Sequence, residues 1–204
     1  MKVSNQSDHP VTDEACQAAT GKTMKAWFAE FDQMDGLKKG RREIGKYLQD
    51  QKINPWWGAT LVVEYETHHG VTKKDGRSEG YTICVTKNIS APVEKVYAVW
   101  TDPASFGEMF GDNGRQDASE GGMITCDAGC QATMTRVRPN KDLRFEWQHA
   151  GCTAPMTTDV QFQDNKGKTL MNVMTSRIQT RAEADGLRSA WADFLNQLKA
   201  KSEG

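Results

Sequence analysis

The most regular pattern of apolar positions lies near the carboxyl-terminal end of the chain and predicts a long amphipathic helix. Thr180 and Glu183 form a T-x-x-E capping box, a motif whose side chains satisfy free backbone N–H groups at a helix start. Apolar residues then recur every three or four positions, as on one face of a helix. They are Leu187, Ala190, Trp191, Phe194, Leu195 and Leu198. A helix of about 20 residues would span roughly 30 Å.

A two-residue period, which is typical of β-strands, dominates the part of the chain before this helix. Residues 81–85 alternate between apolar and polar, and similar runs follow between 122 and 177, with turns at 140–141 and 165–167. Residues 92–110 predict two short helices, each opened by a proline. We therefore expect an α+β fold, in which an antiparallel sheet turns its apolar face toward the long helix.

The front of the chain has a different character and predicts separate parts. Residues 1–19 are polar and are expected to form a disordered leader. Residues 20–69 carry apolar residues at helical spacing in three short stretches, which predicts a small all-α domain of three helices. Residues 70–80 contain three glycines and five charged residues, which is the composition of a linker. Residues 81–204 then form the second domain.

The composition limits the classes of function. The net charge is −1, from 26 Lys and Arg against 27 Asp and Glu, which argues against a strongly basic nucleic-acid-binding protein. No apolar run approaches the roughly 18 residues of a transmembrane helix, and the start lacks the apolar stretch of a secretory signal. We therefore expect a cytoplasmic protein without membrane contact. Five cysteines, an odd number, predict mostly free thiols in a reducing compartment.

The candidate binding site is the space between the predicted sheet and the long helix, because apolar side chains from both would line it. Strand parity points seven side chains into this space: Ile124, Cys126, Met134, Phe145, Trp147, Val160 and Phe162. Leu187 and Trp191 would face them from the long helix, and Trp100, Phe106 and Phe110 would close the mouth of the space. Two interpretations stay open. The residues line a cavity for a small hydrophobic or aromatic molecule, whose orientation Thr135 or Gln148 would set, or they fill a solid core at normal packing density.

Cys126 and Cys130 flank a three-residue turn and would face each other across a hairpin. A disulfide, a pair of metal ligands and two buried free thiols are all compatible with this spacing. His149 and Cys152 would complete a set of four metal ligands only if the neighbouring strand end came close. Structural zinc sites usually show two close-spaced ligand pairs, so we favour free thiols and expect no metal.

Motifs of catalysis are missing from the sequence. It has no G-x-S-x-G and no H-E-x-x-H, and both G-K-T triplets carry another residue, Cys16 or Phe162, in place of the first P-loop glycine. His68 and His69 at a helix end and the basic cluster at 38–42 are interpreted as solvated charges. We expect no catalytic residue and no cofactor.

The order of elements from about residue 80 to 201 resembles the START-like helix-grip fold of the SRPBCC superfamily. The segments APVEKVYAVWTDP (91–103) and LRFEWQHAG (143–151) are similar to the branch of heat-shock-protein ATPase activator homologues, the Aha type. Glycines at 121–122 and the GKT at 167–169 lie where members of the branch turn into strands. The resemblance implies a ligand cavity, or instead a co-chaperone-like contact through a protein surface. A toxin-sequestering resistance protein and a branch-specific enzyme are further alternatives.

The front of the chain resembles a small bacterial helical domain of unknown function, through TGKTMKAWF (20–28), EIGKYL (43–48) and PWWGATLVVEYE (55–66). This resemblance implies no activity. The apolar face that carries Trp27 and Trp57 has to be covered, either by the second domain or by a second copy of the chain. We therefore expect a monomer or a homodimer.

Overall fold

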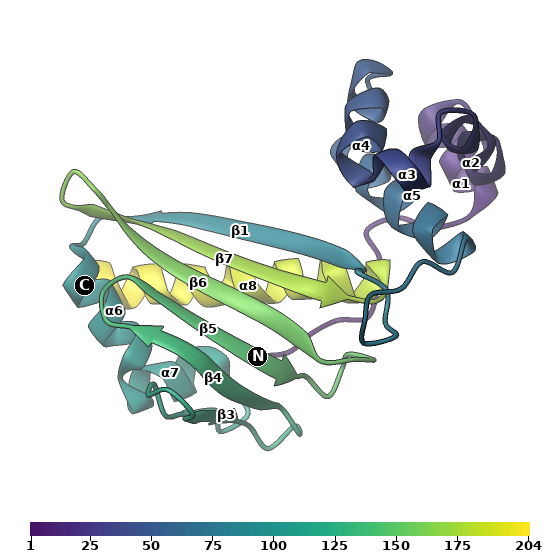
Figure 1. Cartoon of the computed structure of the whole chain (residues 1–204). Helices are drawn as coiled ribbons and strands as arrows, with labels where there is room; N and C mark the ends of the chain where they lie inside the picture. Colours follow the sequence, from purple (N-terminus) through teal and green to yellow (C-terminus); the bar gives the residue numbers. More distant parts are fainter. The chain divides into compact units, whose positions relative to one another are not determined.

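The computed structural model describes residues 1–204 and divides them into two compact units. We call Met1–Gln6 together with Thr82–Gly204 the sheet unit, and Ser7–Tyr81 the helical unit. The chain therefore passes from the sheet unit into the helical unit after Gln6 and returns after Tyr81 (Figure 1). None of the helices combines the length and the apolar composition that crossing a bilayer requires.

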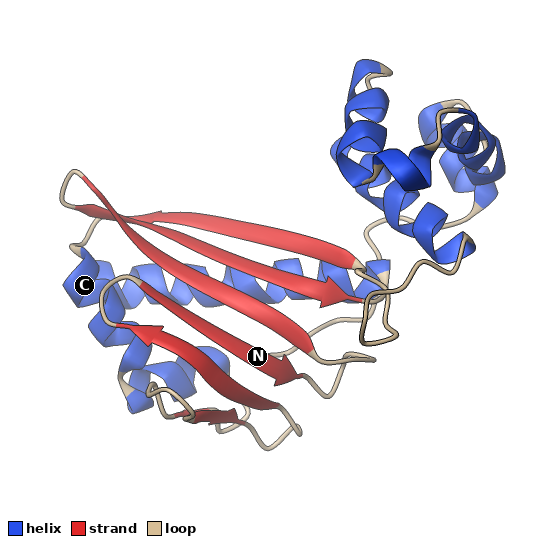
Figure 2. Ribbon diagram, viewed as in Figure 1, coloured by secondary structure: helices blue, strands red, loops and turns tan.

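The secondary structure of the helical unit is helical, apart from Tyr81 at its end, which begins strand β1 (Tyr81–Ile89; Figure 2). Its helices are α1 (Asp13–Thr20), α2 (Met24–Gln33), α3 (Gly36–Lys39), α4 (Arg41–Asp50) and α5 (Pro55–His68). Three of them begin at capping side chains that accept a backbone N–H bond, namely Thr12, Thr23 and Asn54. Helices α2, α4 and α5 correspond to the three expected ones. The α5 start follows from its sequence, since asparagine caps the helix and proline takes its first position.

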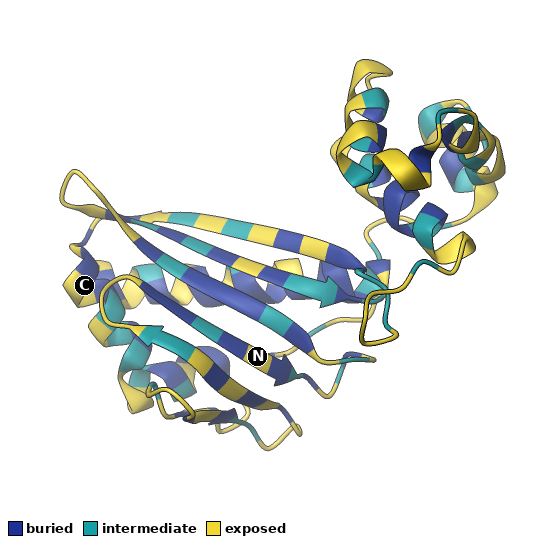
Figure 3. Ribbon diagram, viewed as in Figure 1, coloured by how far each residue is buried: buried dark blue, intermediate teal, exposed yellow.

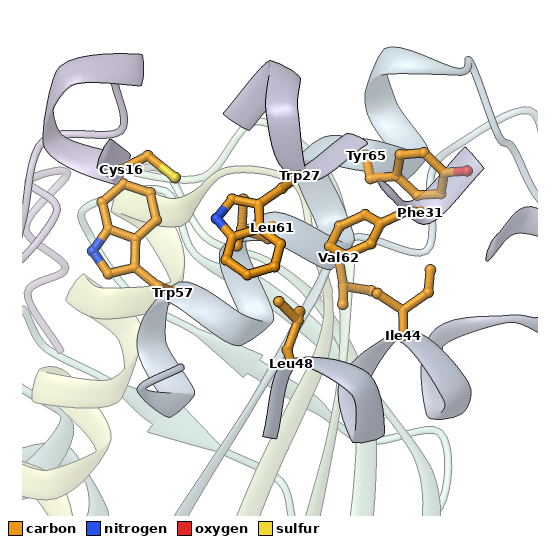
Figure 4. Packing of buried hydrophobic residues seen from close by; sticks show 9 residues of the cluster. All are labelled: Cys16, Trp27, Phe31, Ile44, Leu48, Trp57, Leu61, Val62 and Tyr65. Carbon is orange, nitrogen blue, oxygen red and sulfur yellow. The ribbon is translucent and has the colours of Figure 1, made fainter. Parts of the chain in front are cut away.

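The helical unit buries its own apolar face, which corrects the expectation that another domain or a second chain must cover it. Its core cluster joins residues from four helices (Figure 4). The members are Cys16, Trp27, Phe31, Ile44, Leu48, Trp57, Leu61, Val62 and Tyr65. Two of the large rings have paired polar atoms: Trp27 Nε1 donates to Thr20 Oγ1 at 2.8 Å, and the Tyr65 hydroxyl donates to Asp32 at 2.7 Å.

The first 19 residues differ from the expected disordered leader. Residues 13–20 form α1, and its Cys16 is fully buried in the helical core. The Asp13 carboxylate also accepts the backbone N–H of Met24 at 2.8 Å, which joins α1 to the start of α2. Tertiary packing therefore stabilises a helix that is too short to persist alone. Residues 1–6 lie on the sheet unit.

The sheet unit contains seven strands in the order β1-β7-β6-β5-β4-β3-β2, and neighbours from β2 to β7 are antiparallel. The strands are β1 (Tyr81–Ile89), β2 (Arg115–Gln116), β3 (Met123–Thr125), β4 (Gln131–Arg138), β5 (Asp142–Gln148), β6 (Met156–Asn165) and β7 (Lys168–Ile178). The helices are α6 (Val93–Thr101), α7 (Pro103–Phe110) and α8 (Arg181–Glu203). This arrangement confirms the predicted α+β fold class.

Helix α8 lies across one face of the sheet (Figures 1 and 2). Burial alternates along several strands, so that one face packs on the helices (Figure 3). On β5, for example, Leu143, Phe145 and Trp147 are buried. The opposite face carries charged side chains, where Arg136 and Arg144 both pair with Asp159 at 2.9 Å. The core of the unit therefore lies between the sheet and α8.

Candidate functional site

The residues predicted to line the space between sheet and helix are buried there, except Cys126, which is half-buried. They come from α6, α7, the strands and α8. Trp100, Trp147 and Trp191 each expose 2% of their surface or less. The structure also brings in Phe194 of α8, Leu143 and Val173, which were not among the predicted site residues.

Aromatic rings fill the centre of this space, and we call them the aromatic cluster. Its members are Trp100, Phe106, Phe110, Phe145, Trp147, Trp191 and Phe194. Ring centroids of contacting pairs lie between 4.7 Å, for Trp100 and Phe194, and 6.4 Å, for Phe145 and Trp191. Edge-to-face, tilted and offset arrangements of this kind are favourable for aromatic rings. The centre of the unit is therefore densely packed.

The aromatic cluster contains buried hydrogen-bond donors without a partner. The indole Nε1 atoms of Trp100, Trp147 and Trp191 are buried and form no hydrogen bond, and neither does the nearby Gln116 Oε1. An unsatisfied buried polar group costs about 1–3 kcal/mol of folding free energy. The contrast with the paired Trp27 of the helical unit shows that this is not a general property of the chain. The three N–H groups therefore have unused hydrogen-bonding capacity.

An open pocket of about 310 Å³ adjoins the cluster, and we call it the α7–α8 pocket. It is lined by Met1, Lys2, Glu108, Met109, Phe110, Gly111, Asp112, Ala190, Asp193, Phe194 and Gln197. Phe110 and Phe194 belong to both the pocket and the aromatic cluster, so the pocket leads to the rings. Its volume is at the lower end of the range of small-molecule sites, about 300–1,000 Å³.

Most of the pocket's polar lining was missed by the sequence analysis. Met1 and Lys2 lie in a segment that was expected to be disordered, and Glu108, Asp193 and Gln197 lie on the polar sides of amphipathic helices. One signal was present in the sequence. Gly186 lies inside α8, where a glycine costs about 1 kcal/mol relative to alanine, so it calls for a packing reason but does not identify the segment that packs there.

His149 lies at the edge of the cluster, with its ring 5.5 Å from that of Trp147. Its Nδ1 accepts the backbone N–H of Gly151 at 3.0 Å, so Nε2 carries the proton and donates to the Met1 carbonyl at 2.9 Å. Burial is the main cause that lowers the pKa of His149, and the amino group of Met1 acts in the same direction. The Met1 carbonyl and Asp112 oppose this shift. Both ring nitrogens are thus bonded to backbone.

The cysteines near this edge are free thiols. Cys126 and Cys130 face each other across the hairpin, where the Cys126 N–H donates to the Cys130 carbonyl at 3.2 Å and the Cys130 N–H donates to Cys126 Sγ at 3.3 Å. Burial raises the pKa of both Cys130 and Cys152 to about 12. No group of three or more His, Cys, Asp or Glu side chains is arranged to hold a metal ion.

The two polar residues expected at the rim bond to backbone instead. Thr135 is exposed, and its hydroxyl donates to the Arg144 carbonyl at 3.3 Å. Gln148 Nε2 donates to the Cys152 carbonyl at 2.7 Å and to the His149 carbonyl at 3.2 Å. The polar groups that the structure offers near the rings are therefore the indole N–H groups.

A long helix packed across one face of an antiparallel sheet, with two short helices after the first strand, defines the helix-grip fold of the START-like (SRPBCC) superfamily. Residues 90–203 match the family described as "Activator of Hsp90 ATPase homolog 1-like protein". The chain belongs to this family, which confirms the resemblance of its second domain. No curated protein matches the sequence.

Solved structures share the fold at low sequence identity. CalU16 from Micromonospora echinospora is 18% identical, over 59% of this chain and 75% of that chain, with a TM-score of 0.53. PFC0360w, an Hsp90 activator from Plasmodium falciparum, is 17% identical over 59% of this chain and 95% of that chain, with a TM-score of 0.52. DynU16, a putative protein in the dynemicin biosynthetic locus, is 23% identical over 58% of this chain and 46% of that chain, also with a TM-score of 0.52.

Proposed function

We propose that the sheet unit binds a small hydrophobic or aromatic molecule that carries hydrogen-bond acceptor atoms. The observation that supports this function is the set of three buried, unpaired indole N–H groups at Trp100, Trp147 and Trp191. Buried polar groups in proteins are normally paired, and unpaired ones call for an explanation. An acceptor-bearing ligand would satisfy them and recover the free energy that their isolation costs.

The α7–α8 pocket supplies the route to these donors. Met109, Phe110 and Phe194 give it an apolar wall, whereas Lys2, Glu108 and Asp193 give it a polar rim. A ligand would first bury apolar surface against the wall, which contributes about 25 cal/mol per Å². It would then reach Trp191 after a rotation of the Phe194 ring, whose centroid lies 5.5 Å from that of Trp191. Binding alone is proposed, without a chemical step.

The test uses 1-anilinonaphthalene-8-sulfonate, an aromatic dye whose sulfonate oxygens accept hydrogen bonds. We expect saturable binding at a stoichiometry of one dye per chain, measured by the rise in dye fluorescence. Trp191→Phe keeps a large ring but removes one donor, and should raise the dissociation constant about tenfold, equivalent to about 1.4 kcal/mol.

Trp57→Phe in the helical core is the matched control, since Trp57 lies outside the sheet unit, and it should leave the dissociation constant unchanged. Absence of saturable binding, or equal effects of the two substitutions, would contradict the proposal.

A second candidate function rests on the family itself. Its description names an activator of the Hsp90 ATPase, and PFC0360w of similar fold is described as an Hsp90 activator. Under this alternative the chain regulates a chaperone through an exposed surface. The measurement is the ATPase rate of a purified Hsp90 with and without the full chain. An unchanged rate at saturating chain concentration would count against it.

A further inference from the structure

The segment Met1–Gln6 belongs to the sheet unit although it is followed directly by the helical unit. It forms no helix or strand. Met1 is nevertheless 6% exposed, which makes it as buried as a core residue. The segment is therefore anchored at Met1, while Lys2, Ser4, Asn5 and Gln6 are exposed and it lies on the surface of the sheet unit.

Helix α8 leaves room for the backbone of this segment at Gly186. A Cβ atom built on Gly186 of α8 would lie 1.8 Å from the Ser4 carbonyl oxygen and 3.2 Å from the Ser4 nitrogen. Any side chain at this position would therefore overlap with the segment. Glycine is a poor helix former compared with alanine, so α8 gives up helix propensity at the point where the segment crosses it.

The front of the segment forms part of the wall of the pocket that leads to the aromatic cluster. Met1 lines the α7–α8 pocket together with Phe110 and Phe194. Its carbonyl accepts the hydrogen bond from His149, and the His149 ring contacts Trp147. The segment thus runs from Gly186, which Ser4 contacts, to the pocket, which Met1 lines. Through His149 it also adjoins Trp147, one of the tryptophans with an unpaired N–H group.

We propose that Met1–Gln6 is a strap that forms one wall of the α7–α8 pocket and has to move away before a ligand passes from the pocket into the aromatic cluster. This inference rests on the proposed function, because it names the element that regulates access to the same site. The strap takes no part in the sheet, so it can detach without breaking a strand pair. When only the open state binds ligand, the apparent dissociation constant equals the intrinsic one divided by the open fraction.

The test is Gly186→Ala in the full chain. The added methyl group collides with the Ser4 backbone, whereas alanine otherwise favours the helix. Gly58→Ala in α5 is the matched control, since nothing lies within 4 Å of a Cβ at Gly58. We expect Gly186→Ala to accelerate amide hydrogen exchange in residues 2–6 and to lower the dissociation constant of the naphthalene dye about tenfold, equivalent to about 1.4 kcal/mol. Gly58→Ala should change neither.

The outcomes separate the strap from the binding function. Faster exchange with unchanged dye affinity would overturn the strap while ligand binding stands. Unchanged exchange in Gly186→Ala would overturn it as well, because the strap then does not leave. No dye binding by any variant would refute the proposed function, and the strap's role with it. His149→Phe, which removes the donor to the Met1 carbonyl, should shift both readouts in the same direction and replaces Gly186→Ala if that variant does not fold.

Discussion

His149 is the one buried histidine among the four in the chain, with 4% of its surface exposed. Its neutral form is stabilised by geometry as well as by burial, because Nδ1 accepts a backbone N–H and has no room for a proton of its own. Protonation of Nδ1 would turn this hydrogen bond into a contact between two donors. The hydrogen bond from Gly151, in the connection between β5 and β6, would be lost, whereas Nε2 would still donate to the Met1 carbonyl of the strap.

This arrangement predicts that stability falls in mildly acidic solution. Folding lowers the pKa of His149 from 6.5, so the unfolded chain binds the proton more tightly. The histidine's contribution is therefore complete above pH 6.5 and is lost as the pH falls through the folded pKa. The slope is at most about 1.4 kcal/mol per pH unit for one proton. Urea denaturation between pH 5 and pH 8, at roughly half-unit steps, measures this slope.

His149→Phe is the comparison for this measurement, and it should have the shallower pH dependence over the same interval. Parallel curves for the two proteins would show that His149 is not the titrating group.

Single residues also mark the limits of prediction from sequence. The inward side chains of Phe145 and Trp147 followed from strand alternation, because parity alone fixes the face of a strand. The role of Gly186 did not follow, because the close approach of Ser4 is a contact between backbones and leaves no pattern of side chains. The unpaired indoles were equally hidden, since pairing depends on where the neighbouring acceptors lie.

The start of helix α8 has only one half of the expected capping box, because the Glu183 side chain bonds to a loop of the sheet unit and not to the backbone of Thr180. Thr180 caps the helix and accepts the Glu183 N–H at 3.2 Å, as predicted. The Glu183 carboxylate, however, accepts the backbone N–H of Thr153 at 2.8 Å, from the loop between β5 and β6. The glutamate is 3% exposed and links α8 to that loop.

We therefore expect Glu183→Ala to destabilise the protein more than Thr180→Ala. Loss of the cap at Thr180 should cost about 1 kcal/mol. Loss of the buried Glu183 side chain removes a hydrogen bond from the Thr153 N–H to a charged carboxylate, which should cost about 1.5–3 kcal/mol. The free energy of unfolding from urea titrations provides the comparison. Equal losses in the two variants would mean that water replaces the carboxylate at Thr153.

Elements with a long amphipathic pattern, or with a proline at the helix start as in α6 and α7, were predictable, whereas α1 and the strap, which have neither, were not. Helix α8 repeats its apolar spacing over several turns, and the start of α5 has both a cap and a proline. Helix α1 has only eight residues and one buried side chain, Cys16, so its pattern is too brief to be recognised. The strap has no periodicity at all. Packing, which the sequence does not display, decides the structure of such segments.

On the scale of the whole molecule, each of the two units has its own hydrophobic core. The helical core cluster centres on rings such as Trp27 and Phe31, with centroids 6.2 Å apart, and the sheet unit is built around the aromatic cluster. Domains with separate cores are able to unfold separately. The change of pattern near residue 80 allowed the sequence to indicate both parts.

Phe31→Ala should destabilise the helical unit selectively. Phe31 is fully buried and its ring centroid lies 5.2 Å from that of Tyr65, so its removal leaves a cavity. The expected cost is about 3–5 kcal/mol. Hydrogen exchange followed by mass spectrometry should show faster exchange in α2, α4 and α5, with unchanged protection in β5, β6 and β7. The half-buried Phe28 supplies a milder control, Phe28→Ala. Equal acceleration in both units would instead indicate a single cooperative structure.

The course of the chain gives the strap a consequence beyond the pocket. Gln6 of the strap is bonded directly to Ser7 of the helical unit, so a released strap lengthens one of the two tethers of that unit. A molecule that binds the helical unit more tightly when this tether is long favours the open pocket. By thermodynamic reciprocity, this molecule would strengthen ligand binding in the pocket by a certain factor, and the ligand would strengthen binding of the molecule to the helical unit by the same factor. Occupancy of the helical unit and occupancy of the pocket would then be coupled through the chain between Gln6 and Ser7.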